Sequence, residues 1–201
     1  MTKEDWQEII KIITPILKAG GFGVFPTDTL YGVVGVALNA KTVEEIYQVR
    51  KRQLDKPFII LISSLNDLKK FGVRINTEQK KTLHAVWPGK VSVVFECKNK
   101  KMEHLHRGKK TLAFRLPEDL NLCALLKKTG PLVAPSANLS GKEAATTYAE
   151  AKKYFSKKVD FYVDGGKLKS KSSTLVSIDV KGNLTVLRQG AVKIAKKLIL
   201  A

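Results

Sequence analysis

The sequence predicts an α/β fold in a single domain that spans residues 1–201. Short apolar runs typical of buried strands alternate with stretches of helical periodicity. No linker, internal repeat or low-complexity tract separates them. A hydrophobic content of 44% is also enough for a sizeable core in a chain of 201 residues.

The first half of the chain alternates between the two kinds of element. Apolar residues recur at helical spacing over residues 3–19, and two glycines at 20 and 21 end that pattern. Ser64 and Asp67 form a capping box that begins a short helix through Lys70. The other predicted elements of this half are strands at 22–26, 32–38 and 57–62 and helices at 43–52 and 76–86.

The second half continues the alternation. Residues 98–110 are polar and basic and are predicted to form a loop or hairpin. Thr147 and Glu150 form a second predicted capping box, at the start of a helix over 147–155. The remaining predictions are strands at 91–97, 111–116, 132–135, 159–163, 173–178 and 184–188, a helix at 118–128 and a C-terminal helix.

The charge of +18, from 36 Lys and Arg against 18 Asp and Glu, indicates a polyanionic partner such as RNA or a nucleotide. Scattered lysines that reflect only a compositional bias are the alternative. No apolar run approaches a membrane span and no signal peptide is recognisable, so we expect a cytoplasmic protein. Cys97 and Cys123 lack metal-ligand spacing, and no disulfide is expected between them.

The segment APSANLSG at 134–141 is the most informative one in the chain. It follows an apolar run at the predicted end of a strand, where α/β sheets open their ligand crevices. Ser136 and Asn138 would share one face of an extended backbone, and their hydroxyl and amide groups suit an oxygen-rich ligand. A Ser/Asn/Gly turn without a binding role is the alternative.

Two further polar segments follow or precede predicted strands. The segment PTDTLYG at 26–32 offers hydroxyls, a carboxylate and a phenol, either as the wall of a pocket or as a turn closed by Asp28. The basic segment RKRQLDKP at 50–57 follows a helix end, where cations are favoured by the helix dipole. The segment is either a solvated turn or a binding site for a triphosphate.

The strand at 111–116 places Thr111, Ala113 and Arg115 on one face. Because a buried unpaired charge is costly, Arg115 needs a partner, either a substrate carboxylate or an internal acid. The hydroxyl-rich segment SSTLV at 172–176 and Arg188, before a glycine, complete the candidate segments.

The usual catalytic templates are absent from the sequence, including phosphate-binding glycine loops, zinc spacings and activated-serine motifs. His84, His104 and His106 have no carboxylate or nucleophile beside them and are predicted to be surface or loop residues. The remaining possibility for catalysis is a site that binds a nucleotide and a small zwitterion and acts by aligning them.

Taken in order, these segments resemble the YrdC/TsaC family, the threonylcarbamoyl-AMP synthases, in its short single-domain form. The resemblance runs from Ile10 to Gly190. It rests on PTDTLYG, the basic turn before KPFIILI, WPG, TLAFRLP, APSANLSG, SSTLV and LRQG. It implies a strongly twisted mixed sheet flanked by helices around a basic cavity.

The resemblance also implies a nucleotidyltransferase reaction. L-Threonine, bicarbonate or CO2, and ATP would give threonylcarbamoyl-AMP and pyrophosphate, for t6A modification of tRNA by a downstream threonylcarbamoyl transferase. Mg2+ would be held through the ATP phosphates, with no metal site on the protein. Direct tRNA binding is a further expectation.

By position, the resemblance assigns roles to residues of this chain. Arg50 and Arg52 would be catalytic. The implied threonine contacts are Thr27, Thr29, Tyr31, Arg115, Ser136 and Ser173, and the implied ATP contacts are Arg52, Lys56, Thr111, Asn138, Thr146 and Arg188.

The sequence departs from the family pattern at four positions that bear on threonine selectivity. Arg50 replaces a usual Lys, Gln53 a common Pro, Leu61 a His found in some homologues, and Ser172 a frequent Glu. Two alternatives stay open. One is an RNA-binding protein without adenylation activity. The other is the carbamoyl-adenylate chemistry of hydrogenase maturation proteins, whose zinc-finger-like and acylphosphatase parts are not found in this sequence.

Overall fold

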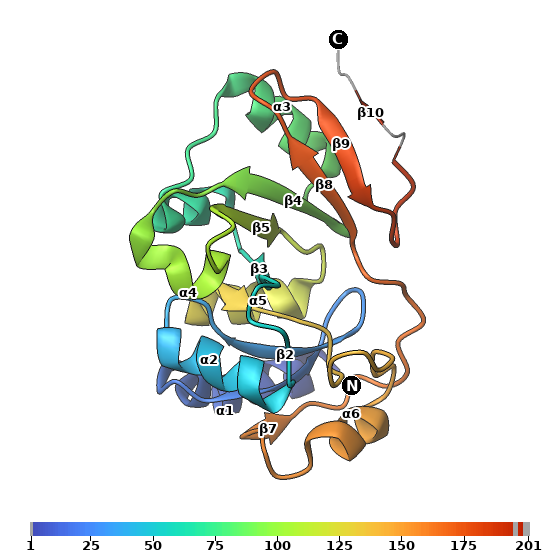
Figure 1. The fold of residues 1–201 in the computed structure, drawn as a ribbon. Helices are drawn as coiled ribbons and strands as arrows, with labels where there is room; N and C mark the ends of the chain where they lie inside the picture. The colour runs from blue at the N-terminus through green and yellow to red at the C-terminus, as the bar shows by residue number, and fades with distance from the viewer. Residues whose placement is uncertain (1, 195–196, 199–201) are drawn as a thin grey trace.

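The computed structural model describes residues 2–194 and 197–198, which form a mixed α/β fold (Figure 1). Ten strands join in one sheet, in the order β10-β9-β8-β4-β5-β3-β6-β2-β1-β7. The strands are β1 (Phe22–Pro26), β2 (Tyr31–Val36), β3 (Ile59–Leu61), β4 (Val91–Glu96), β5 (Thr111–Arg115), β6 (Leu132–Val133), β7 (Phe161–Tyr162), β8 (Thr174–Ile178), β9 (Leu184–Arg188) and β10 (Lys197–Leu198).

The sheet is mixed, as predicted. The pairs β1/β7, β3/β5 and β4/β8 are parallel, and the other neighbouring strands are antiparallel. In Figure 1 the sheet runs from β9 at the top through β3 in the middle to β7 at the bottom. The short central strands β3 and β6 therefore join two larger halves of the sheet, and the site described below draws residues from both.

Helices cover the two faces of the sheet. They are α1 (Lys3–Lys18), α2 (Ala40–Val49), α3 (Thr77–Val86), α4 (Glu103–His106), α5 (Leu120–Thr129) and α6 (Tyr148–Phe155), with 3-10 helices η1 (Leu65–Phe71) and η2 (Lys100–Met102). Leu17 of α1 and Leu126 of α5 pack with Val34 of β2, whereas the adjacent Val33 packs with Ile46 of α2. Because successive strand residues point to opposite faces, α1 and α5 lie on one face and α2 on the other.

The helix starts follow the sequence closely, with one correction. The predicted capping box of Ser64 and Asp67 is present at η1. At α6 the predicted pairing of Thr147 with Glu150 is only half formed. Thr147 caps the helix, but the Glu150 carboxylate accepts instead from the backbone N–H of Thr146 at 2.7 Å. Thr146 lies one residue before the N-cap, and its N–H has no acceptor within the helix, so the Glu150 carboxylate can accept from it.

Two regions differ from the predicted elements. Residues 98–110 contain η2 and α4, whose apolar side chains Met102 and Leu105 join the core, and His106 is buried beside them rather than at the surface. At the C-terminus, Lys197–Leu198 pair as a strand with β9 instead of continuing the predicted helix. An edge strand such as β9 offers unpaired backbone groups to a following segment. Residues 191–194 are also described and are not helical. Residues 195–196 and 199–201, including Lys196, lie outside the described residues.

Within the part of the chain that the structure describes, no helix is long and apolar enough to cross a membrane. Cys97 and Cys123 are both free. Each thiol instead donates to a backbone carbonyl, Cys97 to Phe71 at 3.3 Å and Cys123 to Pro117 at 3.2 Å.

We predict that Gly35→Ala destabilises the fold. A Cβ at Gly35 would lie 2.6 Å from the Thr42 methyl and 2.8 Å from Ile46 Cδ1, so α2 would have to move off β2. Such overpacking costs about 1–3 kcal/mol, measurable by urea denaturation. Gly32→Ala on the same strand is the control, because its nearest contact is 3.4 Å. Equal stability of the two variants would contradict the packing argument.

Candidate functional site

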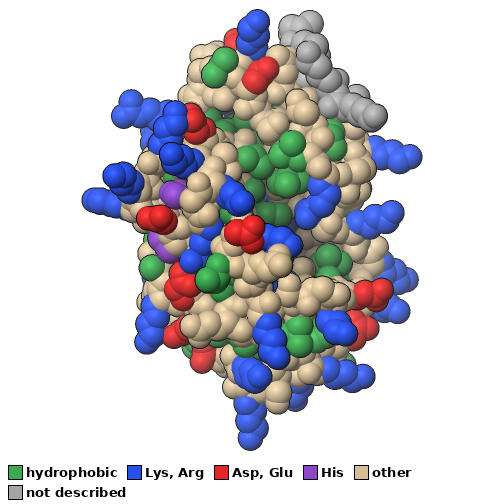
Figure 2. All heavy atoms as spheres, in the orientation of Figure 1, with side chains coloured by type: hydrophobic (Ala, Val, Ile, Leu, Met, Phe, Trp, Pro, Cys, Tyr) green, Lys and Arg blue, Asp and Glu red, His purple; other side chains and the backbone are tan. Residues whose placement is uncertain are grey.

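A cavity of about 340 Å³ lies at the junction of the two halves of the sheet. This volume falls within the range of roughly 300–1,000 Å³ that is usual for small-molecule sites. Figure 2 shows the hollow between the upper and lower parts of the molecule, with hydrophobic side chains on its upper wall and Lys or Arg side chains around it. The cavity is lined from chain segments that are far apart in the sequence.

Most of the residues expected at a site do line this cavity. The lining residues among them are Thr27, Thr29, Tyr31, Arg50, Arg52, Thr111, Arg115, Ser136, Ser173 and Arg188. Lys56, Asn138 and Thr146 do not appear in the lining. Of the positions that depart from the family pattern, Arg50 and Ser172 line the cavity, whereas Leu61 lies in the core with α1 and α5.

Arg50 is the largest fully buried side chain in the cavity wall, at 1% exposure. It follows the last turn of α2, so the helix directs it inward. Its Nε donates to the backbone carbonyl of Asn138 at 3.1 Å, and its Nη2 donates to Asn138 Oδ1 at 2.9 Å. Its Nη1 is buried and has no hydrogen-bond partner within residues 2–194 and 197–198. The guanidinium is therefore fixed on one side and free to accept an anion on the other.

Asn138 holds Arg50 rather than facing the cavity. Its amide nitrogen donates to the carbonyls of Leu139 at 2.9 Å and Lys142 at 2.7 Å, which fixes its orientation. The Ser136 hydroxyl donates to Asn138 Oδ1 at 2.7 Å, so the two side chains meet, consistent with a shared face. An ATP contact by Asn138 stays a prediction, since its polar atoms are already used.

Arg115 has an internal acid as its partner. Its Nη1 pairs with the Asp28 carboxylate, and both side chains are only 4% exposed. The Arg115 Nε and the second Asp28 oxygen are buried without a partner among the described residues. Arg115 still lines the cavity. The ion pair thus compensates the charge of a buried guanidinium and leaves donor capacity for a further anion.

The hydroxyl groups around Arg115 are partly used by the protein. Thr27 and Thr29 share a hydrogen bond of 3.0 Å, and Thr27 also donates to the Leu30 carbonyl. The Tyr31 hydroxyl donates to the Gly166 carbonyl at 2.7 Å, which ties β2 to the segment before β8. Burial raises the pKa of Tyr31 above its usual value, so this phenol stays protonated at neutral pH.

The cations of the cavity repel one another. Burial, and then the charge of Arg52, lower the pKa of Arg50 to about 9 and also lower that of Arg188. Burial lowers the pKa of Arg52 as well. At neutral pH all three guanidinium groups remain charged. A bound anion would relieve this repulsion, so the cavity favours anionic ligands.

Backbone contacts set the positions of the two outer arginines. Arg188 donates from Nη2 to the Ser173 carbonyl at 3.0 Å, and the Ser173 hydroxyl shares a hydrogen bond of 2.8 Å with Ser92. Arg52 donates from Nε to the carbonyl of Lys56 at 3.2 Å. Lys56 thus supports the turn through its backbone, and a phosphate contact by its side chain stays a prediction.

The sequence analysis missed Lys109, which lines the cavity from the segment after α4. One lysine among many gives no sequence signal, and its position depends on how the segment that contains η2 and α4 folds. Asp28 was recognised as polar, but nothing in the sequence connects it to Arg115, 87 residues away.

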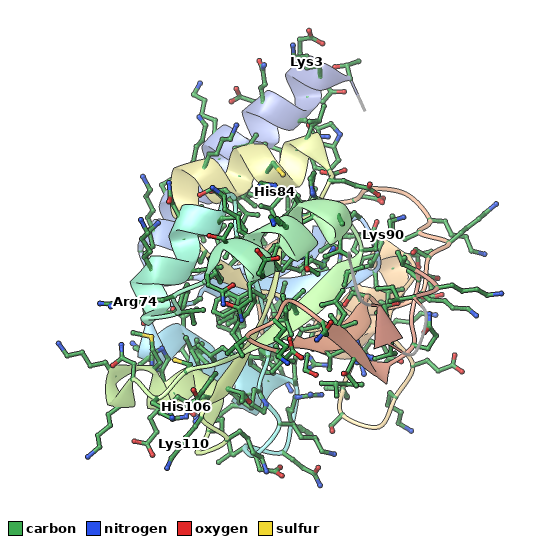
Figure 3. The ribbon with its side chains drawn as sticks, turned by 90° about the horizontal axis from the view of Figure 1, so that it is seen from above. Lys3, Arg74, His84, Lys90, His106 and Lys110 are labelled. Atoms are coloured by element: carbon green, nitrogen blue, oxygen red, sulfur yellow. The ribbon has the colours of Figure 1, made fainter. Side chains whose placement is uncertain are left out.

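The histidines do not form a site. His84 lies on α3 and His106 on α4, well apart in the view from above (Figure 3). Across the described residues, no three His, Cys, Asp or Glu side chains gather where they could hold a metal ion. The charge of the cavity wall therefore comes from arginine and lysine side chains.

The chain is similar to known proteins over most of its length. A family model for Sua5/YciO/YrdC proteins, described as "Telomere recombination", matches residues 15–190. A putative threonylcarbamoyl-AMP synthase of Methanocaldococcus jannaschii is 30% identical over 98% of this chain and 92% of its own length. A threonylcarbamoyl-AMP synthase of Pyrococcus abyssi is 30% identical over 81% of this chain, which spans about half (48%) of that longer protein.

The fold agrees with a solved structure of the same kind. Sua5 of Pyrococcus abyssi in complex with L-threonine superposes with a TM-score of 0.82 at 29% identity, over 90% of this chain and 54% of that one. The family resemblance found in the sequence and the mixed, twisted α/β fold are both confirmed. With a family match that covers most of its length, this chain belongs to the Sua5/YciO/YrdC family.

Proposed function

We propose that this chain is an L-threonylcarbamoyladenylate synthase, a nucleotidyltransferase that makes threonylcarbamoyl-AMP and pyrophosphate from L-threonine, bicarbonate or CO2, and ATP. The names of its relatives and the threonine complex of the Pyrococcus abyssi protein support this activity. The product would serve t6A modification of tRNA, through a downstream transferase.

One observation carries the proposal: a single cavity offers two separate kinds of anion site. Arg115 lines this cavity together with Thr27 and Thr29, a set that suits the carboxylate and hydroxyl of a small amino acid. Arg50 and Arg52 lie in the same cavity, which suits a chain of phosphates. An enzyme that joins an amino acid to a nucleotide needs both sites within reach of each other.

The chemistry follows from that placement. The threonine amine adds to CO2 and loses a proton, which gives a carbamate. A carbamate oxygen then bonds to the α-phosphorus of ATP, the bond from that phosphorus to the β-phosphate oxygen breaks, and pyrophosphate leaves. Negative charge grows on the phosphate oxygens in this step, and Arg50, with a buried unpaired Nη1, is the cation best prepared to offset it.

The described residues do not fit a protein-held metal ion, because none of their Asp or Glu side chains lines the cavity and Asp28 is engaged by Arg115. Any Mg2+ would therefore come with ATP, and we assign it no step. The same proposal includes substrate contacts by four further residues, Thr111, Ser136, Ser173 and Arg188. It also includes a single domain over residues 1–201, direct tRNA binding and a cytoplasmic location.

The activity is tested by pyrophosphate release from ATP, with threonine and bicarbonate each omitted in turn. We expect release only when both are present, and a threonylcarbamoyl-AMP product by mass spectrometry. Release that needs bicarbonate but not threonine would indicate another acceptor, with Ser172 in the cavity lining as the position to examine. No release with any combination would contradict the proposal and favour the RNA-binding alternative.

We expect Arg52→Ala to lower pyrophosphate release by roughly 100-fold or more, since it removes a cation aimed at the developing charge. Lys128→Ala on α5 removes the same charge from an exposed position outside the cavity lining and is the control. Both variants should unfold at the same urea concentration as the parent. Full activity of Arg52→Ala would contradict the phosphate role of this residue.

The carboxylate role of Arg115 is tested by removing the ion pair as a unit, with Arg115→Met and Asp28→Asn together. This double variant avoids leaving one buried charge alone. A charge-assisted hydrogen bond contributes about 1.5–3 kcal/mol, so the threonine KM should rise by roughly ten- to a hundred-fold. The ATP KM should change little. An unchanged threonine KM would place the amino acid elsewhere.

A further inference from the structure

Two turns each contribute a cation to the lining of the cavity. One is the turn at 51–57 after α2, which carries Arg52, and the other is the turn at 107–110 after α4, which carries Lys109. The two are joined by an ion pair in which Lys109 Nζ lies 3.7 Å from Asp55 Oδ2. The site roles discussed above use neither of these two residues.

We propose that Lys109 is a polyphosphate-binding residue and that Asp55 takes the place of the phosphates while the cavity is empty. Binding of a triphosphate would exchange the Asp55 carboxylate for phosphate oxygens on Lys109. This inference rests on the proposed function for the identity of the nucleotide, but not for the exchange itself.

The backbone fixes where Lys109 starts. Its N–H donates to the carbonyl of His106 at 2.8 Å, and the carbonyl of Lys110 accepts from Cys97 at 2.7 Å. Arg107 and Lys110 have positive φ angles of 50° and 55°. Such conformations are unfavourable for residues other than glycine and cluster at ligand-binding and other functional sites. The turn is thus held at both ends, and only the Lys109 side chain needs to move.

The two turns are also held at a fixed spacing. Arg107 lies over the Tyr47 ring at 4.1 Å and pairs with Glu44 of α2 at 2.6 Å. The Tyr47 hydroxyl donates to the carbonyl of Lys56 at 3.0 Å, next to Asp55. Tyr47 therefore connects both turns, and Lys109 stays within reach of the anions that Arg52 binds.

The ion pair itself is suited to exchange. The Lys109 and Asp55 side chains are 53% and 64% exposed, so water competes with their contact and the pair is weak. Asp55 also raises the pKa of Arg52, against the lowering by burial, so its charge is felt by a second cation of the cavity lining. A triphosphate carries several charges and would compete well against one solvated carboxylate.

The test measures affinities for tripolyphosphate, ATP and AMP by calorimetry at low salt, where surface charge pairs are least screened. Lys109→Gln should lower the affinity for tripolyphosphate and for ATP by about 5- to 10-fold. It should lower the affinity for AMP by less than about 2-fold, because AMP lacks the outer phosphates. Lys110→Gln is the matched control. Lys110 lies near His106 in the same segment (Figure 3) and is outside the cavity lining, and its substitution removes the same charge.

Asp55→Asn should have the opposite effect and raise the affinity for tripolyphosphate by about 2- to 3-fold, because it removes the competing carboxylate. That gain should shrink when Lys109→Gln is also present. Equal effects of Lys109→Gln and Lys110→Gln, or no gain from Asp55→Asn, would overturn the inference, as would a parent protein that binds no tripolyphosphate.

These measurements need neither threonine nor turnover. A protein that shows the expected affinities but releases no threonine-dependent pyrophosphate would leave this inference standing and would refute the proposed function. The reverse result is synthase activity with an ATP affinity that Lys109→Gln does not change. That result would refute only the inference.

Discussion

Burial of arginine is the constraint on which the rest of this structure depends. Arg50 and Arg115 are 1% and 4% exposed, and each is charged at a place where water cannot solvate it fully. The protein meets this cost with Asn138 for Arg50 and Asp28 for Arg115. In both cases the internal partner satisfies only part of the guanidinium. Both arginines line the ligand cavity and keep a buried donor without a partner among the described residues. An anionic substrate that reached these donors would complete networks that folding leaves unfinished.

The topology of the sheet makes this arrangement possible. Asp28 comes from the β1–β2 turn and Arg115 from the end of β5, and they meet because β3 and β6 join the two halves of the sheet between them. Arg50 reaches Asn138 in the same way, from the end of α2 to the turn after β6. Catalysis by alignment requires rigid neighbours. Here the rigidity comes from contacts between segments that are distant in the sequence.

Much of the fold could be predicted, because it depends on local patterns. Apolar periodicity located α1, a short apolar run located β1, and the Ser64–Asp67 box located η1. The helices at 100–106 escaped detection because their apolar residues are few among charged ones. Most of the residues proposed for the site from motifs with recognisable spacing line the cavity. The sequence did not show that Asn138 holds Arg50, that Asp28 pairs with Arg115 or that Lys109 lines the cavity. Each of these positions is set by packing between segments that are distant in the sequence.

The central claim is that one cavity holds the amino acid and the nucleotide together, each on its own arginine. The most direct measurement is a crystal structure with L-threonine and a non-hydrolysable ATP analogue bound together. The account predicts the threonine carboxylate within hydrogen-bonding distance of Arg115 and the phosphates beside Arg50 and Arg52. Threonine bound away from Arg115, or two ligands that exclude each other from the cavity, would contradict it.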